Sequence, residues 1–219
     1  MKKALIASII ILAPLFAFSQ ESNLGNWLIY FGNKKINQQW NWHHEVQYRN
    51  YDAGGDLEQL LLRTGIGRNL SEGNNNLLLG YGYIISQNYI PVLNEKIRVN
   101  EHRIYQQFIN KHKLGISKLQ HRFRLEERWV EGDFRMRFRY FLGFNLPLTN
   151  KKLIENTAYL SAYNEIFINL QNQAFDRNRL YGGLGFKVND LLRFELGYMN
   201  QFFRMGGRDQ VNMIAFVSF

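Results

Sequence analysis

The sequence predicts an all-β fold, an antiparallel up-and-down transmembrane β-barrel, on three observations. Long segments alternate apolar and polar residues, with glycines on the polar phase and aromatic residues near the segment ends. The chain begins with a segment typical of exported proteins and contains no cysteine. It finishes on an apolar alternating segment whose final residue is phenylalanine.

The first 19 residues, MKKALIASIIILAPLFAFS, predict a secretory signal peptide. Two lysines precede an apolar run over residues 4–18, and the small residue Ser19 suits cleavage after it. The run is shorter than the roughly 20 residues of a spanning helix, and Pro14 interrupts it. We therefore expect residues 1–19 to be removed and residues 20–219 to form one barrel domain in the cell outer membrane of a Gram-negative bacterium.

The composition narrows the chemistry of the mature chain. The absence of cysteine excludes disulfides, thiolate metal sites and a lipid-modified cysteine anchor. The formal net charge is +9, and aromatic residues make up 15% of the chain. The mean hydropathy of -0.33 is that of a soluble protein. The prediction of a membrane barrel therefore depends on whether the aromatic side chains share one face of each strand.

Period-two alternation is clearest in three stretches. In residues 40–49, tryptophan, valine and tyrosine occupy one phase while asparagine, glutamate and arginine occupy the other. In residues 133–144, three arginines lie opposite a row of aromatic and aliphatic residues, and residues 119–128 repeat the split. A helix would place these arginines on all sides, so strands are favoured.

The segments that we expect to be strands are mostly longer than the usual strand of a soluble protein and match the roughly 9 to 11 residues that cross a bilayer. They are residues 25–32, 39–51, 58–70, 76–87, 96–110, 114–130, 133–147, 156–169, 177–188, 191–204 and 210–219. Single-chain bacterial barrels have an even number of strands with both termini on one side. We therefore predict about twelve strands, with one hidden in residues 88–100 or 148–160. Ten is the alternative, if residues 25–32 form a plug or cap.

The last segment separates a membrane barrel from a soluble β-sandwich, which would show the same alternation. Its apolar phase includes Val211, Met213, Val217 and Phe219. This ending resembles the C-terminal recognition strand of outer-membrane barrels, so we expect Val217 and Phe219 to act as an assembly signal for the barrel assembly machinery. The alternative is a buried last strand of a periplasmic β domain.

Six short stretches together resemble the DUF2490 family. They are NEHRIYQQ (100–107), HRFRLEERW (121–129), RFRY (137–140), NEIF (164–167), RNRLYGGLGF (177–186) and ELGYMNQ (195–201). The resemblance runs over essentially the whole mature chain and implies an uncharacterised outer-membrane β-barrel of a family found mainly in Bacteroidetes. The family has no established activity, so the resemblance implies no catalytic residue.

Charged residues on the polar phase form the candidate site in the predicted lumen. They are Arg103, Arg122, Arg124, Arg128, Arg135, Arg137, Arg139, Glu101, Glu126, Glu165 and Glu195, with Arg49, Arg63, Arg179, Arg193 and Glu45 on the same phase. Our first interpretation is an Arg–Glu ladder that closes the lumen of a structural or partner-binding barrel. The alternative is a small anion-selective pore, because arginines outnumber carboxylates.

An outer-membrane lipid-modifying hydrolase is the second alternative. The histidines are His43, His44, His102, His112 and His121, and Ser117 or Ser161 could serve as nucleophile. No G-x-S-x-G motif and no triad spacing supports it, so we predict no catalytic, cofactor-binding or metal-binding residue. The expected partners are outer-membrane lipids, lipopolysaccharide and the barrel assembly machinery; nucleic acid is not expected, and no oligomeric state follows from the sequence.

Overall fold

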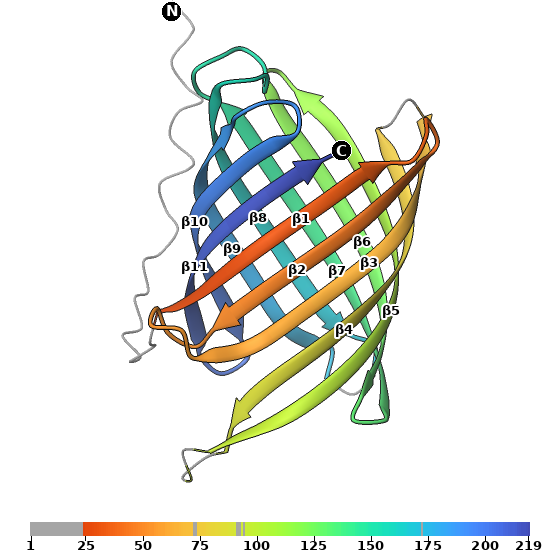
Figure 1. The fold of residues 1–219 in the computed structure, drawn as a ribbon. Helices are drawn as coiled ribbons and strands as arrows, with labels where there is room; N and C mark the ends of the chain where they lie inside the picture. The colour runs from red at the N-terminus through yellow and green to blue at the C-terminus, as the bar shows by residue number, and fades with distance from the viewer. Residues whose placement is uncertain (1–23, 72–73, 91–92, 94, 172) are drawn as a thin grey trace, which may run out of the picture.

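The structure, a computed structural model, describes residues 24–71, 74–90, 93, 95–171 and 173–219. These residues form a closed barrel of eleven β-strands (Figure 1). The prediction of an all-β barrel is thus confirmed, while the expected signal peptide, residues 1–19, lies outside the described residues. No helix in the described part of the chain is long and apolar enough to cross a membrane.

The strands follow one another around the barrel in sequence order, and the predicted segments match them to within a few residues at each end. They are β1 (Gly25–Lys35), β2 (Trp40–Asn50), β3 (Leu57–Leu70), β4 (Asn75–Tyr89), β5 (Lys96–Leu114), β6 (Ser117–Val130), β7 (Asp133–Pro147), β8 (Thr157–Asn169), β9 (Phe175–Lys187), β10 (Leu192–Phe203) and β11 (Gly207–Ser218). Every sequential pair is antiparallel.

The barrel closes through a parallel pair, β1 beside β11, in which Asn33 faces Ser218. The predictions of twelve strands and of ten were both wrong, because they assumed an antiparallel closure. Eleven alternating strands leave the first and last pointing the same way, so Gly25 and Phe219 lie at opposite ends of the barrel. We call the end with Phe219 the upper end, as in Figure 1, and the other the lower end.

Side chains alternate between the outer surface and the lumen along every strand. On the outside, Leu184 is 62% exposed, whereas Glu126 on the inside is 0% exposed. Other exposed apolar residues on the outside include Leu28, Trp42, Leu62, Ile66, Leu79, Leu196, Tyr198 and Met213. The outer phase also holds a polar pair, in which Gln106 Nε2 donates to Glu127 Oε1 over 3.3 Å.

Inward glycines make room for tyrosine rings on the neighbouring strand. A Cβ atom at Gly80 would lie 2.2 Å from the ring of Tyr105, and one at Gly185 would lie 2.2 Å from Tyr159. Glycine in a strand often marks such a close approach. The glycines of the polar phase therefore let large side chains fill a narrow lumen.

One wall of the lumen is apolar. Trp27 and Ile29 of β1 point inward and pack with Tyr181, Met199 and Ile214 from β9, β10 and β11. The apolar phase of β1 therefore faces the lumen, in contrast to β2 and β7. Charged side chains also border this wall, because the guanidinium groups of Arg49 and Arg179 lie 3.7 and 4.9 Å from the centre of the Trp27 ring.

Candidate functional site

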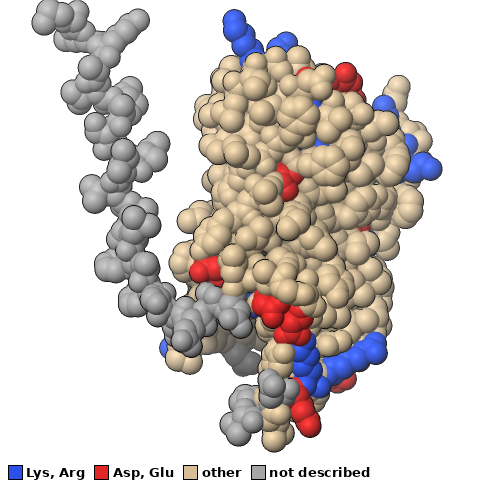
Figure 2. Space-filling view, turned by 60° about the vertical axis from the view of Figure 1, so that its left-hand side comes forward, with Lys and Arg blue, Asp and Glu red and all other residues tan. Residues whose placement is uncertain are grey.

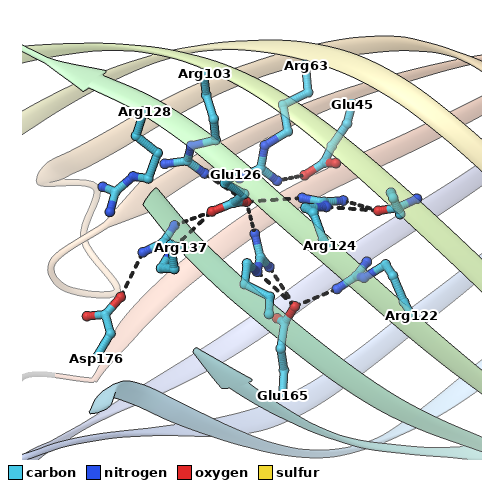
Figure 3. Close-up of polar contacts among 12 residues, drawn as sticks. Glu45, Arg63, Arg103, Arg122, Arg124, Glu126, Arg128, Arg137, Glu165 and Asp176 are labelled. Atoms are coloured by element: carbon cyan, nitrogen blue, oxygen red, sulfur yellow. Dashed lines mark hydrogen bonds and ion pairs between the residues drawn. The ribbon is translucent and has the colours of Figure 1, made fainter. Parts of the chain in front are cut away.

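Glu126 of β6 lies at the centre of a buried charge cluster (Figure 3). Its Oε2 accepts hydrogen bonds from Nε and Nη2 of Arg137 at 3.0 and 2.7 Å. Its Oε1 accepts from Nη1 of Arg139 at 2.6 Å and of Arg103 at 3.4 Å. Because these arginines come from β5 and β7, the strands on either side of β6, a single carboxylate joins three strands.

Two further carboxylates lie between Glu126 and the lower end of the barrel. Glu101 of β5 accepts a hydrogen bond of 2.6 Å from Nε of Arg128 and one of 2.5 Å from Nη2 of Arg103. Asp176, at the start of β9, accepts one of 2.8 Å from Nη1 of Arg137. Charge-assisted hydrogen bonds of this kind are stronger than neutral ones.

Glu165 of β8 extends the cluster towards the upper end. Its Oε1 accepts from Nη2 of Arg139 and from Nη2 of Arg122, each at 2.7 Å. Five arginines and four carboxylates are thereby held together. We call this cluster without Arg122, whose side chain is 17% exposed, the plug. The plug consists of Arg103, Arg128, Arg137, Arg139, Glu101, Glu126, Glu165 and Asp176.

Arg124 lies beside the plug, and no carboxylate among the described residues is hydrogen-bonded to it. It stands directly opposite Arg139 in the β6–β7 register, so two like charges face each other. Its Nε and Nη2 donate to Gln107 Oε1 at 2.9 and 2.5 Å, and its guanidinium lies 4.5 Å from the ring centre of Tyr105. Neutral partners therefore carry most of the contacts of this arginine, and Glu126 lies 3.6 Å from its Nη1.

Above the plug, a cavity of about 1110 Å³ extends through the lumen towards the upper end. We call it the vestibule. Its lining residues run from Asn189 and Lys113, at the upper turns, down to Arg139 and Glu165 of the plug. Glu126 and Arg137, which lie lower in the plug, do not line it. On the side of β5 to β8 the vestibule therefore ends at the plug, and beside β1 and β2 it extends as far as Trp27 and Arg49.

Comparison with known proteins places this barrel in a family. The sequence matches the family model described as "Protein of unknown function (DUF2490)" over residues 24–212. The chain belongs to the DUF2490 family. An uncharacterised protein of Methylorubrum extorquens is 30% identical over 170 residues, which cover 72% of this chain and 69% of that protein.

Four of the eleven charged residues of the predicted site lie outside the plug of this DUF2490 barrel, namely Arg122, Arg124, Arg135 and Glu195. Arg135 has the inward phase, but it lies near the β6–β7 turn, where its side chain is 54% exposed and 3.5 Å from Asp133. Glu195 lies on the vestibule wall, where Tyr159 Oη donates to it at 2.8 Å and Arg193 lies 3.6 Å away. Asp176 was missed, because the predicted strand began one residue later.

The histidines of the DUF2490 barrel do not gather at one site, although the rings of His112 and His121 stack with their centres 5.1 Å apart. His43 points into the vestibule, with Nε2 3.4 Å from Glu45 Oε2. His102 and His121 pair instead with Tyr81 and Tyr140. Within the described residues, no hydrogen bond joins Ser117 or Ser161 to a histidine, and no group of three or more His, Asp and Glu side chains is arranged to hold a metal ion.

Proposed function

We propose that this DUF2490 protein is an integral outer-membrane β-barrel whose lumen is closed to passage, with a structural or partner-binding role. The observation that carries the proposal is an inverted distribution of polarity. Arginine and glutamate fill the inside, while leucine, tryptophan and other apolar side chains cover the outside. Water on the outside would oppose this arrangement, whereas lipid favours it.

The outer surface supports a membrane setting. In the view of Figure 2, charged atoms gather mainly near the two ends of the molecule, and few lie between them. Aromatic side chains such as Trp42 and Phe194 lie towards the upper end, and Tyr198 and Phe202 lie towards the lower end. Closure of the barrel also pairs the backbone groups that lipid could not satisfy.

The plug supports a closed barrel rather than a pore. An anion-selective pore needs cations that remain unpaired along a continuous path. At the plug, Glu126, Glu101 and Glu165 each accept hydrogen bonds from arginines, and the vestibule ends there on the side of β5 to β8. The lumen charges are thus braced against one another at this level.

The expected export and assembly features form part of the proposal. Phe219 is 58% exposed, and its backbone N donates to Asn33 O while its O accepts from Lys35 N, each at 2.9 Å. These contacts support an assembly role for Val217 and Phe219, read by the barrel assembly machinery, in a membrane of lipids and lipopolysaccharide. Deletion of Phe219 should lower the amount of folded barrel in membranes, measured by immunoblot; unchanged levels would reject that role.

Fractionation and single-channel recording test the proposal. The expressed protein should co-fractionate with the outer membrane and migrate faster on a gel before heating than after it. In planar bilayers the purified barrel should show no steady conductance. Recovery in the soluble periplasmic fraction would exclude the membrane barrel, and a steady anion current would favour the pore.

A further inference from the structure

The vestibule carries a large excess of positive charge. Twelve lysines and arginines line it, against four aspartates and glutamates. The plug, which shares Arg139 and Glu165 with this lining, has equal numbers of each sign, so the excess belongs to the other residues of the vestibule. A basic cavity with low-dielectric walls concentrates anions.

Three lysines at the mouth account for much of this excess. Lys111 and Lys113 come from β5, and Lys118 comes from β6, where it stands directly opposite Lys113. None of the three forms an ion pair within 4.0 Å among the described residues. Lys118 also lies within electrostatic reach of Lys187 and Arg193. Like charges in such positions repel each other, and a bound anion would relieve the repulsion.

Two arginines further down have donors that are buried and unused. Nη1 of Arg124 and Nε of Arg63 make no hydrogen bond within the described part of the chain. Their side chains are only 2% and 4% exposed, and both residues line the vestibule. A buried donor without an acceptor is destabilising, so Nε of Arg63 is suited to an acceptor from the cavity, whereas Nη1 of Arg124 already lies 3.6 Å from Glu126 Oε1.

The spacing of these cations indicates a ligand with several charges. Arg124 lies six positions after Lys118 on β6, a length of about 20 Å along the strand. A guanidinium suits the oxygens of a phosphate group, and lysine ammonium groups attract such a group without strict geometry. A single monovalent anion could not contact both Lys118 at the mouth and Arg124 below it.

We propose that the vestibule binds a multivalent phosphate-bearing anion, with lysines at the mouth and Arg124 and Arg63 below. The same chemistry is present in a soluble polyphosphorylated molecule and in the headgroup of a phosphorylated lipid. The inference goes beyond the proposed function, because it concerns what the vestibule holds and not where the barrel resides. It also differs from a pore, since the ligand enters and leaves by the same end.

Calorimetric titration of the purified full-length barrel with sodium tripolyphosphate, in neutral detergent at low salt, tests this inference. Saturable binding near one ligand per barrel is expected, and it should weaken as salt rises. Adding phosphatidic acid to the micelles separates the two sources. Loss of tripolyphosphate binding would assign the site to a lipid headgroup, and retention would assign it to a soluble anion. The absence of saturable binding at low salt would overturn the inference.

Paired variants make the test specific to the vestibule. The double variant K111Q/K118Q should bind tripolyphosphate more weakly, by about tenfold for each lost contact. The matched control is K151Q/K152Q, which removes two exposed lysines that do not line the vestibule and should leave the affinity unchanged. Equal losses in both variants would mean general charge attraction and would overturn the inference. The titration needs no membrane, so conductance in bilayers would contradict the closed barrel without altering this result.

Discussion

The plug and the vestibule use the same kinds of residue at neighbouring levels of one lumen, yet their charges are arranged in opposite ways. In the plug, the β6–β7 register sets Glu126 opposite Arg137, and unlike charges meet. In the vestibule, the β5–β6 register sets Lys113 opposite Lys118, and like charges meet. Register alone does not explain the difference, because Arg103 and Arg128 of the plug also stand opposite each other. Glu101 accepts hydrogen bonds from both of these arginines, whereas no carboxylate lies within 4.0 Å of Lys113 or Lys118 among the described residues.

A buried charged side chain requires a protein partner of opposite charge, whereas an exposed one does not. Glu126 is 0% exposed, so its charge needs donors from the protein. Lys111, Lys113 and Lys118 are exposed at the mouth, where water solvates them. Unpaired cations are therefore tolerated at the mouth of the vestibule and would be severely destabilising in the plug.

The largest effect is expected from Glu126→Gln in the plug. The substitution removes the charge that Arg137 and Arg139 share, and the free energy of unfolding should fall by about 3 to 5 kcal/mol. The measurement is denaturant titration of the folded, fast-migrating form on gels. Asp133→Asn is the control, because the Asp133 side chain is 78% exposed and should contribute little. A loss no larger than that of the control would show that the plug does not brace the barrel.

A smaller effect of opposite sign is expected from Lys118→Gln in the vestibule. Removing one of two facing lysines relieves repulsion, so the free energy of unfolding should stay the same or rise by up to about 0.5 kcal/mol. The same denaturant titration measures it, and the gain should disappear at high salt, which screens exposed charges. Destabilisation by more than about 1 kcal/mol would mean that Lys118 has a partner in the protein.

A third effect, also small, is expected at the lower rim, where Asp56, in the β2–β3 connection, pairs with Lys96 and accepts a hydrogen bond of 2.6 Å from Tyr89 Oη. Partial burial raises the pKa of Asp56, but the hydrogen bonds from Lys96 and Tyr89 outweigh it and hold that pKa below its usual value. The pair therefore adds stability above the unfolded pKa of about 3.9, and this is lost as the pH falls through the lower folded pKa.

Asp56→Asn should accordingly cost less than about 1 kcal/mol at neutral pH, because the pair is partly exposed. The wild-type and variant unfolding curves should converge in acid, where Asp56 is protonated in both states. Denaturant titrations at several pH values measure the difference in the free energy of unfolding between the wild type and the variant. If this difference persists at the most acidic pH, the loss of stability comes from lost packing and not from lost charge.

The sequence determined the strands and the direction of their side chains. Period-two alternation is a local property of a pleated strand, so the inward phase of Arg137 and Glu126 follows from the sequence alone. The turn residues likewise predicted the ends of the strands to within a few residues. The family, too, could be inferred from short stretches, and the match over residues 24–212 confirms it.

Only the tertiary structure decided how the barrel closes and which charges meet. The parallel pairing of β1 with β11, and hence eleven strands, depends on the tilt and stagger accumulated around the whole sheet, which no single segment encodes. The same accumulated register gives Arg137 a carboxylate on each side, Glu126 and Asp176, while it leaves Arg135 near a turn and partly exposed. Side-chain alternation is fixed within a strand, whereas charge pairing is fixed between strands.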